Sequence, residues 1–185
     1  KMKKLIKLTF FFSFLMLFVA CGDDDLEPTL AQDKDLNTGI NNAGDLASVM
    51  NSAYDRMTPS GYYGRNQIVM GDVRTDNAYS NVNSGRFTDS DMDYSPNGAG
   101  PWGTIYRAIA ICNIVIGTDI SGLEGDQGAM THTQGQAYAL RALLHFDLLQ
   151  DYGQHFISGA GGAGALGVPY VKTYKDPANL SPARD

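Results

Sequence analysis

Two stretches with helical apolar spacing, separated by a short turn, restrict the possible folds more than any other feature of this chain. Apolar residues recur at steps of three and four from Pro101 to Gly117 and again from about Asp126 to Tyr152, as they do along one face of an α-helix. Pro101 is predicted to open the first stretch, since proline is tolerated in a first helical turn, and Gly117 is predicted to be its C-cap. Gly153 ends the second stretch. The predicted buried residues are Trp102, Ile105, Tyr106, Ile109, Cys112, Asn113 and Ile116 on the first helix and Ala137, Leu140, Leu143, Leu144 and Leu148 on the second. Two such helices form a hairpin that cannot bury its apolar faces alone and needs neighbours.

A third helix is predicted ahead of this hairpin. From Asn37 to Met57 the apolar residues again follow helical steps, with Asn37 or Thr38 as the cap and Pro59 and Gly61 as the stop. The residues from there to the next helix are expected to be irregular, or to hold several short elements. This region, residues 58–100, is long for a loop in a compact domain, and loops this long tend to be functional.

The end of the chain holds little predicted structure. Residues 159–167 read as a flexible glycine-rich loop, and the VPYV that follows at 168–171 is too short for more than an edge strand. Ser181 and Pro182 resemble the cap and first turn of a helix that does not follow. We therefore expect the sequence to be truncated at this point.

The first 20 residues are predicted to be a secretion signal rather than part of the fold. Four lysines precede a nearly apolar stretch, Leu8 to Ala20, that is short for a membrane span. The residues before Cys21 resemble a bacterial lipobox, in which the cysteine carries lipid after cleavage, although Phe18 stands where leucine is usual. The alternative is a plain signal peptide with an incidental cysteine. Residues 21–36 begin with Cys21 followed by GDDDLE and are predicted to be a solvated acidic tether.

The net charge argues against a nucleic-acid-binding protein, and the cysteine content indicates the role of Cys112. Without the four lysines of the signal, 10 Lys and Arg stand against 20 Asp and Glu, a net charge of −10. A chain this acidic is a poor partner for phosphate backbones, so no nucleic acid is expected. Cys112 is the only cysteine besides Cys21, and we predict that it is a small core residue.

Motifs for catalysis and cofactors are weak. Two G-x-G-x-x-G matches lack the context that gives the motif its meaning, because no strand leads into the first and no helix follows the second, so no cofactor is expected. Asp89, Asp91 and Asp93 begin like a calcium loop but lack its glycine and its final glutamate, leaving a weak calcium site or a solvated acidic loop. Asp72 and Asp76 are a candidate carboxylate pair for glycoside hydrolysis, yet nothing else in the sequence supplies acid–base chemistry.

The stretch GYYGRNQIVMGDVRTDNAYS, residues 61–80, has two readings that the residues alone leave open. Tyrosine rings offer flat faces to a pyranose, and Asp, Asn and Arg supply directional hydrogen bonds. Equally, these side chains can tie down their own backbone, with Arg74 paired to Asp72 or Asp76 and Ile68 to Met70 docked on the helices. The candidate ligand-binding residues are Tyr62, Tyr63, Arg65, Asp72, Asp76, Asn77 and Tyr79.

The order of these features resembles the N-terminal part of SusD/RagB-family proteins, the surface lipoproteins of nutrient uptake in Bacteroidetes. The matching segments are the lipobox with its acidic tether, NSAYDRM, YYGRNQIVMGDVRTDNAY, WGTIYRAIAICNIVI, AYALRALLHFDLLQDYG, GVPYV and LSPARD. They cover essentially the whole chain, with residues 37–185 as the truncated SusD-like domain. Each segment alone is of moderate specificity, and their order together is much more specific.

The resemblance implies an all-α fold of tetratricopeptide-like helical hairpins with long irregular loops. It implies a lipid anchor at Cys21, a location on the outer face of the outer membrane, and no catalysis. It further implies capture of a nutrient, a glycan first, for a SusC-like TonB-dependent transporter. Trp102, Tyr106 and Asn113 match a helix of the family and are taken as packing residues, and Arg141 as a structural charge.

Two alternatives stay open at this point. Instead of capturing a glycan, the chain could be a peptide-binding RagB-like member of the family, or an anchored scaffold of the uptake complex without its own ligand site in this segment. The ligand itself is not identified by the sequence.

Overall fold

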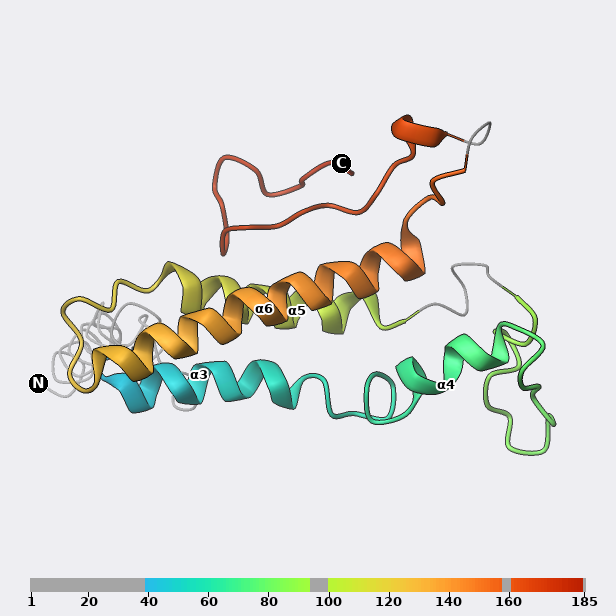
Figure 1. Ribbon diagram of the computed structural model, residues 1–185, viewed down its shortest axis with the longest axis horizontal. Coiled ribbons are helices and arrows are strands. Elements are labelled where there is room, and N and C mark those ends of the chain that lie inside the picture. The colour runs from blue at the N-terminus through green and yellow to red at the C-terminus, as the bar shows by residue number, and fades with distance from the viewer. Residues whose placement is uncertain (1–38, 94–99, 158–160, 185) are drawn as a thin grey trace, which may run out of the picture. The chain divides into compact units, whose positions relative to one another are not determined.

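Four α-helices form the fold in the residues that the computed structural model describes, 39–93, 100–157 and 161–184. They are α3 (Ala43–Asp55), α4 (Asn66–Val73), α5 (Trp102–Gly117) and α6 (Gln127–Tyr152), followed by a short 3-10 helix, η4 (Gly162–Gly164) (Figure 1). No strand occurs among these residues, which confirms the all-α prediction and rules out the edge strand allowed at 168–171. The α4 helix lies within the region that the sequence left irregular or unresolved.

The helix ends follow capping chemistry, with some shifts from the predicted positions. The helix predicted from about Asp126 begins one residue later, and Asp126 caps α6, since its Oδ1 accepts from the N–H groups of Gly128 and Ala129 at 2.7 and 3.1 Å. The start predicted for the first helix is wrong, because Ile40 to Asn42 are not helical and Asn42 caps α3 instead, accepting from Asp45 N at 2.9 Å. The predicted caps Asn37 and Thr38 lie outside the described residues.

The second helix is displaced by one position at each end, and the third ends where expected. Pro101 takes the cap position of α5 rather than the first turn, and the C-cap is Thr118 rather than Gly117. Gly153 caps α6, and its N–H donates to Leu149 O at 2.9 Å.

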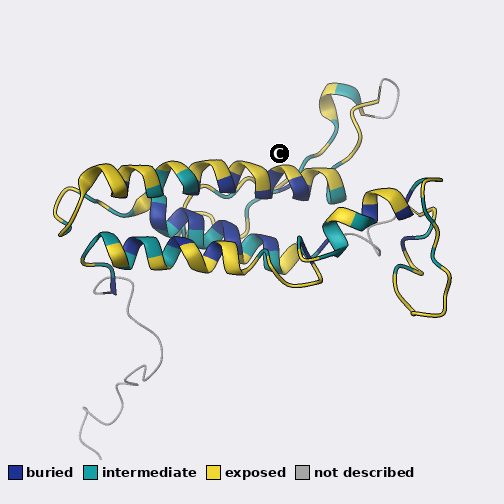
Figure 2. Ribbon diagram, turned by 60° about the horizontal axis from the view of Figure 1, so that its bottom comes forward, coloured by how far each residue is buried: buried dark blue, intermediate teal, exposed yellow. Residues whose placement is uncertain are grey.

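The core lies where α3, α5 and α6 face one another, and the outward faces of these helices are exposed (Figure 2). Its fully buried helical residues are Leu46, Met50, Ala53, Ile105, Ala108, Ile109, Cys112, Val115, Met130, Ala137, Leu144 and Leu148. The burial of Cys112 is confirmed. Trp102 and Leu143, however, were predicted to be buried and are exposed. Leu143 lies about 100° around the helix from Leu144, so the two cannot face the same core.

Side chains of α5 and α6, rather than a second strand, hold the segment at 168–172. The Tyr106 hydroxyl donates to Pro169 O at 2.8 Å, and Asn113 Nδ2 donates to Val171 O at 3.1 Å. Val171 N donates to His145 Nε2 at 3.2 Å. Tyr106 and Asn113 are therefore more than packing residues, because they satisfy the backbone of an extended segment that has no ladder partner.

Arg141 joins this segment to the core. Its guanidinium is buried and donates to Asn113 Oδ1 at 2.8 Å and to Lys172 O at 3.0 Å. The expectation of a structural charge at this position is confirmed. Because one cation serves both α5 and the C-terminal segment, these parts are coupled through α6.

No helix among the described residues is long and apolar enough to cross a membrane. The predicted signal, the tether and Cys21 lie outside the described residues.

Replacing Arg141 with methionine should destabilise the fold by about 2–4 kcal/mol, because the acceptors on Asn113 and Lys172 lose a charged donor in a buried place. Urea unfolding followed by circular dichroism measures the change. Arg107→Met, on the exposed side of α5, is the matched control and should change the unfolding free energy by less than about 0.5 kcal/mol. Equal effects of the two substitutions would contradict the structural role of Arg141.

Stability should fall as the pH drops below about 6.5, the usual pKa of histidine. Burial lowers the pKa of His145, so the folded state binds the proton less readily than the unfolded state does, and acid favours unfolding. The ring is faced by Arg141 of α6, Tyr106 of α5 and Tyr170.

The comparison of wild type with His145→Gln isolates this effect. Asp147, whose pKa burial raises, acts in the opposite direction in both proteins and so cancels. Unfolding free energies between pH 7.5 and 5.5 should depend less on pH in His145→Gln, whereas the exposed His132→Gln should keep the wild-type slope. An unchanged slope in His145→Gln would show that this ring does not control the acid sensitivity.

Candidate functional site

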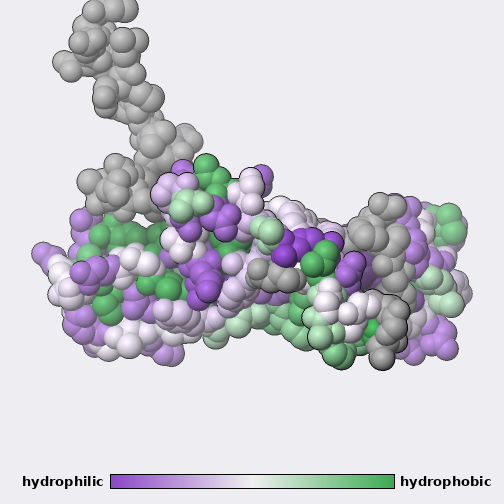
Figure 3. Space-filling model, turned by 90° about the horizontal axis from the view of Figure 1, so that it is seen from above, coloured by the Kyte–Doolittle hydropathy of each residue, from purple (hydrophilic) through white to green (hydrophobic). Residues whose placement is uncertain are grey.

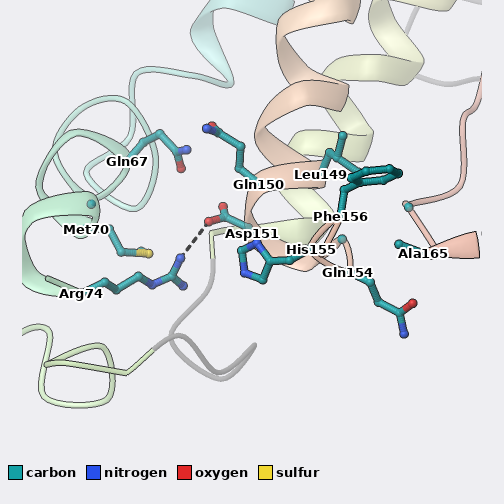
Figure 4. Close-up of a pocket in the computed structure, with 13 residues that line it drawn as sticks. Gln67, Met70, Arg74, Leu149, Gln150, Asp151, Gln154, His155, Phe156 and Ala165 are labelled. Carbon is teal, nitrogen blue, oxygen red and sulfur yellow. Dashed lines mark hydrogen bonds and ion pairs between the residues drawn. The ribbon is translucent and has the colours of Figure 1, made fainter. Parts of the chain in front are cut away.

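A pocket lies between α4 and the carboxyl end of α6, with residues 165–167 along one side (Figure 4). Its volume is about 640 Å³, inside the range of about 300–1,000 Å³ that is usual for small-molecule sites. It is lined by Gln67, Met70, Gly71, Arg74, Leu149, Gln150, Asp151, Gly153, Gln154, His155, Phe156, Ala165 and Gly167. Three separate stretches of the chain therefore build one cavity.

The turn ahead of α4 is fixed on α6 by two tyrosines that share one carboxylate. The Tyr62 hydroxyl donates to Asp147 Oδ2, and the Tyr63 hydroxyl donates to Asp147 Oδ1 at 3.3 Å. Tyr62 is only 1% exposed. Burial raises the pKa of Asp147, and burial together with the nearby carboxylate raises the pKa of Tyr63 to about 12. Gly64 allows the tight turn, since a Cβ there would come within 2.1 Å of Thr58 O.

A nearly buried ion pair holds α4 against the end of α6. Arg74 Nη1 lies 3.1 Å from Asp151 Oδ1, and the two side chains are 9% and 7% exposed. Asp151 Oδ2 also accepts from Gly100 N at 3.2 Å, and the Tyr152 hydroxyl donates to Gly100 O. The predicted pairing of Arg74 with Asp72 or Asp76 is therefore wrong, because the partner lies on a different helix.

The third side of the pocket is held by the backbone after α6. Gln154 N donates to Leu166 O at 2.8 Å, and Leu166 N donates to Gln154 Oε1 at 2.9 Å. Arg184 donates to the carbonyls of Gly167 and Tyr152 at 2.8 and 2.9 Å. These bonds place residues 165–167 beside the helix end.

Polar and apolar groups both line the pocket. Figure 4 shows the amides of Gln67 and Gln150 and the ring of His155 around the Arg74–Asp151 pair, between α4 and the end of α6. Phe156 lies beside Leu149, away from α4, and is 77% exposed. The site thus combines hydrogen-bonding side chains with an accessible aromatic ring.

None of the seven candidate residues predicted from the sequence lines this pocket. Tyr62 and Tyr63 lie together, with ring centroids 4.7 Å apart, beneath the turn. Arg65 bonds Asn66 Oδ1 at 2.9 Å, and its guanidinium lies 5.7 Å from the centroid of the Phe87 ring.

The remaining candidates are on the surface beyond the pocket. Asp72, Asp76 and Asn77 are exposed, and Tyr79 is 80% exposed. The predicted docking of 68–70 is only partly right, since Met70 is buried and Ile68 is exposed.

Sequence reasoning missed Gln67, Gln150, His155 and Phe156. The available signal was the polar run QDYGQHF at the end of the longest helix, followed by a glycine-rich loop. Nothing in that run indicated that α4 would pack against it, because the ion pair joins residues 77 positions apart.

The acidic run at 89–93 was a candidate for a weak calcium site. Among the described residues, no group of three or more His, Cys, Asp or Glu side chains is placed to hold a metal ion. Asp89, Asp91 and Asp93 are all within those residues.

Comparison with known proteins identifies one family. The SusD-like family model described as "Starch-binding associating with outer membrane" matches residues 27–184. The search of curated proteins and the search of solved structures found no match.

Tyr62→Phe should lower the unfolding free energy by about 1–3 kcal/mol, because Asp147 keeps its buried charge and loses its closest donor. Thermal and urea unfolding at neutral pH measure the loss. Tyr54→Phe is the matched control, since its hydroxyl donates to Gln136 at 3.2 Å in an exposed place, and it should be nearly neutral. A neutral Tyr62→Phe would contradict the anchoring role given to this pair.

Proposed function

This chain belongs to the SusD-like family of starch-binding proteins that associate with the outer membrane, and from that premise we propose that it captures a glycan and passes it to a SusC-like TonB-dependent transporter. The family has an outer-membrane role in nutrient binding, and its members are generally binding proteins without catalysis. The proposal goes further than the family in naming a glycan and a transporter.

One observation carries the proposal, the pocket beside α4. Its amides and its exposed aromatic ring suit a ligand with many hydroxyl groups and an apolar ring face. The volume of about 640 Å³ suits one or two sugar units.

The location proposed is the outer face of the outer membrane, with a lipid on Cys21. Its support is the apolar segment before Cys21 and the acidic run directly after it. The acidic tether then leaves the helical domain free to meet both nutrient and transporter.

Within this proposal the seven candidate residues of the tyrosine-rich stretch, residues 61–80, divide into two groups. Tyr62 and Tyr63 act in placing α4, because their hydroxyls are taken by Asp147. The exposed or half-buried members, Arg65, Asp72, Asp76, Asn77 and Tyr79, remain candidates for contact with a longer glycan that extends beyond the pocket.

A second function, a scaffold that docks other proteins of the uptake complex, is favoured by the outward face of α6. Tyr138, Leu143, Phe146 and Leu149 are exposed there at helical spacing. The face of the molecule shown in Figure 3 likewise carries hydrophobic patches among strongly hydrophilic residues. Exposed apolar surface of this kind marks contact sites.

Affinity electrophoresis separates the two functions. The protein should be retarded in gels that contain soluble starch or another neutral polysaccharide, because the ligand binds without turnover, and it should run normally in plain gels. Reducing-sugar assays should show no product. Normal migration on every polysaccharide, together with co-purification of a transporter, would instead support the scaffold.

A further inference from the structure

We propose that the pocket between α4 and the carboxyl end of α6 is the sugar-binding site within this chain, and that it takes an uncharged pyranose unit. This inference rests on the proposed capture of a glycan and adds the place and the chemical class of the ligand. It assigns contact with the sugar to Gln67, Gln150, His155 and Phe156, none of which belongs to the tyrosine-rich stretch.

The charge of the pocket favours a neutral sugar over a uronic acid or a sulfated sugar. The charged side chains that line it are Arg74 and Asp151, and they are paired with each other at 3.1 Å. Each is more than nine-tenths buried, so the pair presents little net charge to a ligand. An anionic sugar would be repelled by the carboxylate of Asp151, and the guanidinium of Arg74 is already paired with that carboxylate.

The amides supply what sugar hydroxyls need. A primary amide offers two N–H donors and a carbonyl acceptor, and a hydroxyl group both donates and accepts. Gln67 projects from α4 and Gln150 from α6, and both side chains lie on the same side of the Arg74–Asp151 pair (Figure 4). Among the described residues neither side chain has a hydrogen-bond partner, so a ligand displaces no internal bond.

The aromatic ring supplies the apolar side. Phe156 lies on the wall of the pocket beside Leu149 (Figure 4) and is 77% exposed, so its ring is accessible to a ligand. The C–H face of a pyranose is flat and apolar, so it can cover such a ring and remove apolar surface from water.

The shape favours a sugar over a peptide. Peptides are usually bound along a sheet edge or in a long groove, and no strand occurs among the described residues. The pocket is instead compact, and it is closed on three sides by α4, the end of α6 and residues 165–167.

A filling substitution on α4 tests the pocket without removing any contact of the fold. Gly71 lines the pocket, and a Cβ placed on it meets nothing within 4 Å. Gly71→Leu therefore extends a side chain into open space, and leucine is also a better helix former than glycine. The matched control is Gly135→Leu on α6, where a Cβ also meets nothing within 4 Å and which lies outside the pocket.

The measurement is retardation in gels of soluble starch and of a second neutral polysaccharide, with polygalacturonate as the anionic probe and melting temperature as the check on folding. Gly71→Leu and Phe156→Ala should each weaken binding to the neutral polymer about tenfold, which corresponds to about 1.4 kcal/mol. Gly135→Leu and Phe146→Ala, an exposed phenylalanine of α6 away from the pocket, should bind as wild type does.

Three outcomes would overturn the inference. If Gly71→Leu and Phe156→Ala bind starch normally while Tyr79→Ala does not, glycan capture stands and the site lies on the tyrosine-rich surface. Stronger retardation on polygalacturonate than on neutral polymers refutes the uncharged class. If the wild-type protein binds no polysaccharide, the proposed function fails together with the site.

Discussion

The polar inner face of α6 is the constraint on which the rest of the structure depends. Arg141, His145, Asp147 and Asp151 follow one another along a helix whose neighbouring residues fill the core. A buried polar or charged group costs free energy unless it is hydrogen-bonded, so each of these needs a partner from another segment. The partners come from the C-terminal segment, from the turn ahead of α4, from α4 itself and from the start of α5.

This arrangement links the pocket to the stability of the core. Asp151 joins α4 and Gly100 to the end of α6, and Asp147 holds the turn that precedes α4. The position of Gln67 relative to Gln150 is therefore set by the Arg74–Asp151 pair in the wall of the pocket and by the bonds of Asp147 outside it. Variation in the exposed lining residues leaves those bonds in place, which lets the ligand preference change while the scaffold stays the same.

Much of the helical framework was predictable, and the site was not. Helical spacing and the Gly153 stop located α6, and the apolar neighbours of Cys112 indicated its burial. The same spacing predicted Leu143 and Trp102 in the core, which is wrong. Apolar spacing shows which positions could be buried, but it does not show which of them the neighbouring helices cover. Arg74 was assigned a partner nearby in the sequence, since sequence reasoning sees local pairs and Asp151 lies 77 residues away.

By itself, the sequence determined the limits of the long helix, because helical periodicity and helix stop signals are local properties of the chain. It also held the order of segments that marks the SusD-like family, and that resemblance implied the all-α class. Only the tertiary structure decided which polar residues are scaffold and which face a ligand. Tyr62 looked like a sugar platform and proved to be 1% exposed with its hydroxyl on Asp147, whereas Gln150 and Phe156 carried no motif and line the pocket. The physical reason is that burial and pairing depend on contacts between segments far apart in the chain, and no local pattern records them.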